Sequence, residues 1–283
     1  MAGSSKKSLT TAPMGQGYLA TVSDLISALL FVFIILLAVF AYQLTNAASE
    51  LASAGAQRNR MLDEISSRLE DAGIVVEVLY DQGILRLSNN AVNFPSGSEI
   101  PVQEHHANVG LLAGALAEVV PCYVSAHRTH THPANVPREQ DNALTIDYCR
   151  PPEHRETPDC RPSPAAWRLE TLLIEGHTDA VPVASGRRFL DNLELSSMRA
   201  ATVHRMIADC EPNIAGLLNS EHYPVLSTSG YGHTRPATLD PALDSKNRRI
   251  DLRFLLEPPK TSLDTKGPAI QTDLRERLER DRP

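Results

Sequence analysis

Residues 172–200 read LLIEGHTDAVPVASGRRFLDNLELSSMRA, and they join two stretches with different hydrophobic patterns. Leu172–Glu175 is a short apolar run ahead of a glycine and predicts a buried strand. From Leu193 to Asp209 the pattern predicts a helix, and the interval between the two is polar and contains a proline. The stretch therefore predicts a strand, a loop and a helix in immediate succession.

The chain on either side of this unit continues the alternation of strands and helices. Asp81-Gln82-Gly83 has the composition of a hairpin turn between two β-rich runs. Apolar residues within Pro101–Val119 recur at three- and four-residue steps, which predicts a core helix. The other expected strands are Ile74–Tyr80, Ile84–Ser88, Val225–Ser229 and Arg249–Leu255. This order predicts an α/β fold, an α+β sandwich in which helices pack on one sheet.

A long apolar segment lies near the N-terminus. No residue in Leu25–Leu44 is charged, and such a helix can cross a hydrocarbon core about 30 Å thick. A secretory signal peptide is the competing interpretation, but Leu25–Phe40 is longer than the roughly 7–15 apolar residues of a signal peptide. Lys6 and Lys7 precede the segment, and the first basic residue after it is Arg58. We therefore expect a retained anchor with a cytoplasmic N-terminus.

Asp24 stands at the head of the apolar segment and is the only charged residue between Lys7 and Glu50. An acid at the bilayer centre costs about 2.5–3.5 kcal/mol, so such residues usually face protein and carry ions or protons. Ser23 and Ser27 would suit a close, polar contact with neighbouring helices. A second interpretation stays open, in which Asp24 caps the helix N-terminus. A single span encloses no ion path, so ion transfer would need partner subunits.

The overall charge and the motifs exclude several classes of function. The chain has 283 residues and a formal net charge of −7, which argues against nucleic acid as a partner. We expect no enzymatic activity and no cofactor, because no catalytic triad, carboxylate pair or phosphate loop stands in a suitable context. His127, His130 and His132 form an HxxHxH motif that would need a fourth ligand to hold zinc. We expect no metal, and a zinc-dependent wall hydrolase remains the rival.

The four cysteines all lie beyond the apolar segment, as expected of a domain that matures in an oxidising compartment. Four cysteines allow three pairings, among which a sequence cannot choose. We expect Cys149–Cys160, closing a proline-rich loop, and Cys122–Cys210, joining that loop to the core. Free buried thiols are the alternative.

Several motifs carry a resemblance to a known family. In order along the chain they are Asn93–Ser98, Gly176–Asp179, Asn192–Ala200, Gly230–Gly232 and Asn247–Ile250. Together they resemble the OmpA-like peptidoglycan-binding domain over roughly Val75–Leu256.

The resemblance implies that this domain grips the diaminopimelate of a peptidoglycan stem peptide. The implied contacts are Thr178, Asp179, Asn192, Leu195, Arg199, Asn247 and Arg248. Chemically, the arginine fork of Arg199 suits a carboxylate, and Asp179 can accept from an ammonium group. A structural Asp179–Arg199 salt bridge is the alternative, and Asn247 and Arg248 either line the pocket or brace its floor.

The combination of one span with an acid, a stalk and this domain resembles the B subunits of ion-driven stators, the MotB and ZorB group. This implies that Asp24 accepts protons while a dimer of this chain sits inside five MotA- or ZorA-like multi-span subunits. The short tail, the Leu-Ile-Ser-Ala-Leu-Leu run after Asp24 and the cysteine-bearing insertion depart from flagellar MotB and favour ZorB of Zorya anti-phage defence. A flagellar stator and a passive membrane-to-wall tether without ion flux are the alternatives.

The expected organisation has five parts and places the chain in a bacterial inner membrane, with the folded domain in the periplasm. The parts are a cytoplasmic tail at 1–17, a transmembrane helix at 18–45, a helical stalk that can self-pair at 46–73, the OmpA-like domain at 74–258 with an insertion at 121–165, and a flexible tail at 259–283.

Overall fold

The computed structural model describes residues 15–124, 126–127, 149, 167–184 and 188–257. The chain divides into two compact units, Met1–Ser53 and Ala54–Pro283, and each is described by itself. The predicted insertion lies mostly outside the described residues, as do both predicted tails, apart from the last residues of the N-terminal one.

The first unit contains the N-terminal part of helix α1 (Gly15–Asp71). Within the described residues, α1 is the one helix long and apolar enough to cross a membrane, judged by length and composition. Its apolar side chains are exposed all round, and Phe40, for example, is 65% exposed. Continuous exposed apolar surface of this kind needs an apolar environment or a partner to cover it.

The second unit is built on one mixed sheet with the strand order β1-β2-β7-β4-β6. Only the β4–β6 pair is parallel among the pairs of this sheet in the described part of the chain, and helix α3 connects those two strands. A second, two-stranded sheet pairs β3 with β5. The strands are β1 (Val76–Leu79), β2 (Ile84–Leu87), β3 (Ala126–His127), β4 (Arg168–Gly176), β5 (Leu217–Leu218), β6 (Leu226–Gly230) and β7 (Ile250–Glu257).

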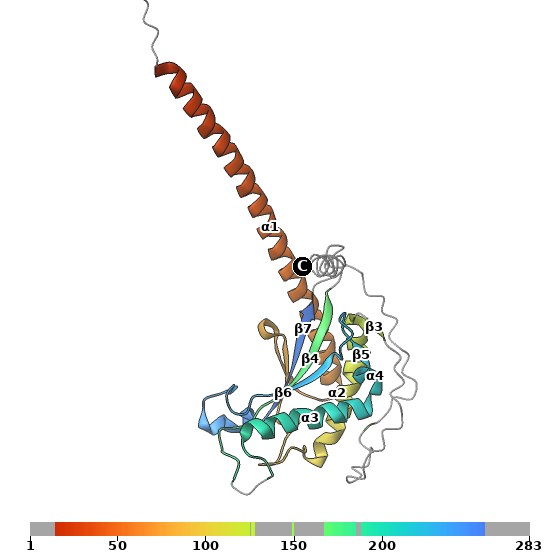
Figure 1. The fold of residues 1–283 in the computed structure, drawn as a ribbon. Helices are drawn as coiled ribbons and strands as arrows, with labels where there is room; N and C mark the ends of the chain where they lie inside the picture. Colours follow the sequence, from red (N-terminus) through yellow and green to blue (C-terminus); the bar gives the residue numbers. More distant parts are fainter. Residues whose placement is uncertain (1–14, 125, 128–148, 150–166, 185–187, 258–283) are drawn as a thin grey trace, which may run out of the picture. The chain divides into compact units, whose positions relative to one another are not determined.

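Helices α2 and α3 lie together on one face of this sheet (Figure 1). The helices of this unit are α2 (His106–Val119), α3 (Asn192–Cys210) and the short α4 (Pro212–Ala215), with 3-10 turns η1 (Tyr80–Gln82), η2 (Gln103–His105), η3 (Val120–Tyr123) and η5 (Pro241–Asn247). The predicted α/β fold of helices on one sheet is confirmed, and β4 and β7 extend beyond their predicted ends.

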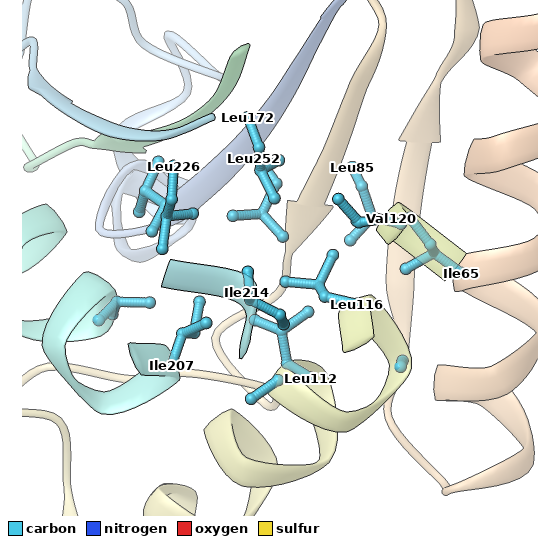
Figure 2. Close-up of a cluster of buried hydrophobic side chains, with 14 of the residues drawn as sticks. Ile65, Leu85, Leu112, Leu116, Val120, Leu172, Ile207, Ile214, Leu226 and Leu252 are labelled. Carbon is cyan, nitrogen blue, oxygen red and sulfur yellow. The ribbon is translucent and has the colours of Figure 1, made fainter. Parts of the chain in front are cut away.

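The hydrophobic core lies between the sheet and the helices. Figure 2 shows Leu172 and Leu252 from the sheet facing Leu116 of α2 and Ile207 of α3. All four are at most 1% exposed. Burying an aliphatic side chain of this size contributes roughly 1.5–3 kcal/mol, so this layer holds the sheet end and the N-terminus of α3 in a fixed relation.

The folded domain begins earlier than the predicted boundary at residue 74. Met61, Leu62, Ile65 and Leu69 of α1 are at most 1% exposed and belong to the same core. Figure 2 shows Ile65 beside Val120. The segment that contains Leu62, Ile65 and Leu69 is helical, as predicted from their spacing. Its apolar face, however, packs on the folded domain. The predicted self-pairing stalk is therefore corrected, because the face it would use is already buried.

The predicted disulfide pairing is wrong. Cys210, the last residue of α3, is bonded to Cys149 across a Cα–Cα distance of 5.0 Å. Cys122, in the turn η3 that follows α2, is also disulfide-bonded. Neither Cys122–Cys210 nor Cys149–Cys160 can therefore form, because Cys210 and Cys149 are joined to each other. None of the described cysteines is free, which removes the free-thiol alternative for those residues; Cys160 itself lies outside them.

Candidate functional site

The site lies where the loop after β4 meets the start of α3. Asp191 caps the helix: its carboxylate accepts a hydrogen bond from the Glu194 backbone N–H at 2.8 Å. Glu194 in turn accepts from the Leu190 backbone N–H at 2.6 Å. This arrangement differs from a capping box only in that Glu194 bonds the residue before the cap, and the two bonds fix the first turn of α3. The Asn192 side chain donates to the carbonyls of Asp179 and Val181, at 3.2 and 3.0 Å, so the cap also holds the loop.

Glycine allows β4 and β6 to approach α3 closely. A Cβ at Gly176 would collide with the carbonyl of Ser196, and one at Gly230 would collide with Ser197. The packing of β4 against α3 therefore requires glycine at position 176, the first residue of the Gly176–Asp179 motif. Because the strand end abuts the helix, the residues that follow Gly176 reach the first turns of α3.

A cavity of about 150 Å³ opens at this junction. Six of the seven predicted binding residues line it: Thr178, Asp179, Asn192, Leu195, Arg199 and Arg248. Ser96 and Gly97 form a further part of its wall. Residues from four of the five sequence motifs therefore converge on one pocket.

Arg199 is the buried cation of this pocket and is 1% exposed. Its Nε donates to the Ser98 carbonyl at 2.9 Å, and Nη2 donates to the Pro95 carbonyl at 3.2 Å. Its guanidinium carbon lies 4.9 Å from the ring centroid of Phe94. Burial lowers the pKa of Arg199 to about 10, and the nearby Asp179 carboxylate opposes that shift. The guanidinium stays charged at neutral pH while its hydrogen bonds go to neutral carbonyls.

Asp179 is paired with a different arginine. Its Oδ2 accepts from Arg248 Nη1 at 2.8 Å, and the two side chains are 15% and 28% exposed. The alternative of a salt bridge between Asp179 and Arg199 is therefore replaced by an Asp179–Arg248 pair at the pocket wall. The pocket thus presents an anion near its mouth and a buried cation below it.

Thr178 is 2% exposed, and its hydroxyl has no hydrogen-bond partner among the described residues. A buried hydroxyl without a partner carries a desolvation penalty of about 1–3 kcal/mol, which a ligand could relieve. Since Thr178 also lines the cavity, its hydroxyl is a candidate contact for a bound molecule.

Asn247 does not line the pocket. Its side-chain oxygen accepts from the backbone N–H groups of Ala237 and Thr238, at 2.8 and 3.2 Å. Its amide donates to the Thr238 carbonyl and to Asp244. Of the two roles left open for the Asn247-Arg248 pair, Arg248 lines the pocket and Asn247 braces the neighbouring loop.

Sequence reasoning missed the contribution of the segment that precedes α2. The Pro95 and Ser98 carbonyls hold Arg199, and Gly97 between them has a left-handed φ of 69°. Pro-Ser-Gly-Ser is recognisable as a turn, and the turn brings these carbonyls to the arginine. The motif match placed this segment in the family pattern without assigning it a contact.

Asp24, Ser23 and Ser27 lie on consecutive turns of α1. The Ser27 hydroxyl donates to the Ser23 carbonyl at 2.8 Å, and the Asp24 side chain is exposed. Since α1 begins at Gly15, Asp24 lies about two and a half turns inside the helix. A capping residue would have to lie at the first turn, so Asp24 does not cap this helix, and its role in ion transfer stays a prediction. Of the HxxHxH motif, only His127 falls within the described residues.

No family model matches this chain, and no curated protein matches it. Solved structures similar to it include a MotB-like protein from Desulfovibrio vulgaris, with 16% identity, a TM-score of 0.43, and coverage of 72% of this chain and 96% of that one. The periplasmic domain of Helicobacter pylori MotB gives 20% identity, a TM-score of 0.40, and coverage of 71% and 92%. The cell wall anchor of the T6SS from Pseudomonas aeruginosa gives 16%, 0.40, and coverage of 71% and 99%.

Proposed function

We propose that this chain is the peptidoglycan-anchored B subunit of a proton-driven stator in a bacterial inner membrane. In this proposal the pocket of the folded domain holds the cell wall, and Asp24 carries the proton. The chain acts by binding and by moving a charge, and it catalyses no covalent reaction. The observation that carries the proposal is the buried Arg199 in a cavity whose wall also presents Asp179.

The pocket suits one end of a diaminopimelate residue, which is a zwitterionic amino acid. A carboxylate that reaches Arg199 would meet a guanidinium whose present acceptors are neutral carbonyls. Charge-assisted hydrogen bonds are roughly twice as strong as neutral ones. A carboxylate would therefore bind Arg199 more strongly than a water molecule would. The ammonium group would then lie toward Asp179, which can share its second oxygen while keeping Arg248.

The N-terminal helix suits proton transfer when other helices surround it. Protonation removes the charge of Asp24 and so changes how that side chain fits its neighbours. A single helix encloses no path, so we propose a homodimer of this chain inside a ring of five MotA- or ZorA-like multi-span subunits. The departures from flagellar MotB favour ZorB of Zorya defence. A helicase-like gene beside this one would support that assignment, whereas flagellar genes would support the alternative.

The wall-binding step is tested by sedimenting the full chain, in an uncharged detergent, with isolated sacculi. Arg199→Ala should reduce retention by about 10- to 100-fold, the equivalent of the 1.5–3 kcal/mol of a charged hydrogen bond. Asp179→Asn removes the anion with little change in shape and should also weaken retention. Arg205→Ala is the matched control, because Arg205 lies on the same helix but is exposed. Undiminished retention of both pocket variants would refute the site.

The motor step is tested by proton flux in liposomes that contain the chain together with its multi-span partner. Asp24→Asn should abolish flux while leaving retention on sacculi unchanged. Glu50→Gln, at the next acid along the same helix, should leave both unchanged. Flux that survives Asp24→Asn would leave a passive tether as the function, and wall binding would stand independently.

A further inference from the structure

The sheet face opposite α2 and α3 carries a row of charged side chains. In the strand register, Glu77 of β1 lies opposite Arg86 of β2, and Arg86 lies opposite Asp251 of β7. Asp251 in turn lies opposite Glu175 of β4. Residues that face each other across neighbouring strands project from the same side of a sheet, so these four share one face.

The two buried carboxylates in this row are fully engaged by arginines. Asp251 accepts from Arg86 at 3.0 and 3.2 Å and from Arg249 at 3.0 Å. Glu175 accepts from Arg253 at 2.7 and 3.1 Å. Both carboxylates are 1% exposed.

A cavity of about 240 Å³ lies over this row. Its described walls contain four guanidinium groups but only two carboxylates: Arg86, Arg235, Arg249 and Arg253 against Glu175 and Asp251. A neighbouring cavity of about 580 Å³ shares Arg86 and Arg249 and adds one further cation, Lys246, and one carboxylate, Glu77. The cavity therefore has an excess of positive charge, which favours an anion.

Two buried groups in the cavity wall have hydrogen-bonding atoms without partners. Among the described residues, Arg249 Nη1 makes no hydrogen bond, although Arg249 is only 4% exposed. The ring nitrogens of His177, which is 1% exposed, likewise have no hydrogen-bond partner in the described part of the chain, although Nε2 lies 3.5 Å from Oδ2 of Asp251. Burial and the charge of Arg249 lower the pKa of His177 to about 3, so its ring is neutral and offers one N–H donor.

A metal ion is the obvious competing occupant, because ligand atoms of Glu175, His177 and Asp251 lie within 4.8 Å of one another. However, both carboxylates already accept hydrogen bonds from guanidinium groups. A divalent cation would have to displace those groups and remain beside their charge. The electrostatics of this cluster therefore disfavour a cation.

We propose that this cavity binds a small oxyanion, a carboxylate or a phosphate group, held by Arg249 Nη1 and the N–H of His177. The site lies back to back with the first pocket, because His177 precedes Thr178 and Asp179, and Arg249 follows Arg248. The two segments are joined by a hydrogen bond of 3.1 Å from His177 N–H to the Arg249 carbonyl. This inference stands independently of the wall-binding proposal.

The test is the thermal unfolding of the full chain in an uncharged detergent, followed by the fluorescence of Trp167, the single tryptophan. Phosphate is raised while chloride keeps the ionic strength constant, and acetate replaces phosphate in a parallel series. The unfolding midpoint should rise with the logarithm of the anion concentration once that concentration exceeds the dissociation constant, by about 3–6 °C at ten times the dissociation constant. Acetate and phosphate distinguish the two oxyanion classes, and a rise with either one supports the site.

Variants separate site binding from a general salt effect. Arg249→Gln should remove the rise of the midpoint with phosphate, and exposed Arg235→Gln should weaken it without disturbing the buried ion pairs. Arg205→Gln, the same charge change outside the cavity, should retain the rise in full. A rise of equal size in all variants, or no rise of the wild-type midpoint with either anion, would overturn the proposal. Because sacculi play no part, failure here leaves the wall-binding test unaffected.

Discussion

Buried arginines lie on both sides of the end of β4, and their charges are compensated differently. On the face opposite the helices, Asp251 and Glu175 accept hydrogen bonds from Arg86, Arg249 and Arg253. On the side of the helices, Arg199 donates to backbone carbonyls, and Asp179 in the same pocket is bonded to another arginine.

The difference separates arginines that are paired with carboxylates of the chain from an arginine whose hydrogen-bond acceptors are neutral carbonyls. A buried ion pair is stable only when both partners are present and hydrogen-bonded. The Asp251 and Glu175 groups meet that condition within the chain. Arg199 makes no such pairing in the described part of the chain, and we propose that the anion of a ligand supplies it.

The largest expected effect is on stability, when a carboxylate is removed from the buried ion pairs on the face opposite the helices. Asp251→Ala leaves Arg86 and Arg249 without their carboxylate and should lower the free energy of unfolding by about 3–5 kcal/mol. Denaturant unfolding followed by Trp167 fluorescence measures it. Glu77→Ala removes an exposed partner of Arg86 and should change stability by less than about 1 kcal/mol. Equal losses from the two substitutions would erase the contrast.

Arg199→Lys tests whether the arginine on the side of the helices contributes to ligand affinity or to stability. Lysine keeps a positive charge but loses the planar fork, so affinity for a stem peptide should fall by about 1.5–3 kcal/mol. Isothermal titration of the full chain measures the affinity, and the unfolding free energy should change less than in Asp251→Ala. A large loss of stability without loss of affinity would assign Arg199 to the fold.

His177, on the face opposite the helices, makes the free energy of unfolding depend on pH. In the unfolded chain the imidazole takes up a proton near its ordinary pKa of 6.5, but in the folded chain only near 3. Lowering the pH between these values therefore favours unfolding, by up to about 1.4 kcal/mol per pH unit. His177→Gln should flatten the plot of stability against pH in that window, whereas exposed His233→Gln should not. An identical slope in wild type and His177→Gln would contradict the assignment.

The smallest effect is expected at the partly exposed Asp179–Arg248 pair. Arg248→Gln should change the unfolding free energy by less than about 1 kcal/mol, because solvent screens this pair. Stem-peptide affinity should change less than in Arg199→Lys, since Asp179 remains to accept an ammonium group. Titration of both variants under the same conditions compares them.

The predictable part of the fold is the part governed by local periodicity. The strand that leads into Gly176 and the helix predicted from Leu193, which begins at Asn192, followed from spacing, and six of the residues named from the motifs line one cavity. The docking of Ile65 and Leu69 was not predictable, because an apolar helix face looks the same whether it packs on its own domain or on another copy. The cysteine pairing depends on where α3 ends in space, which spacing along the chain does not reveal.

The sequence also did not predict that charged residues near the end of β4 line two separate cavities. His177 and Asp179 are two residues apart, yet they line different cavities at the end of one strand. Asn247 and Arg248 are adjacent, and one braces a loop while the other lines the pocket. Which neighbour takes which role depends on the long-range register of β4 and β7.

The most direct measurement compares two stem peptides that differ only in the third residue, diaminopimelate or lysine, by titration into the full-length chain. Lysine lacks the second carboxylate, so wild type should bind the diaminopimelate peptide about 10- to 100-fold more tightly. In Arg199→Ala the two peptides should bind alike. Equal affinities in wild type, or a preference that survives Arg199→Ala, would show that Arg199 does not read the carboxylate.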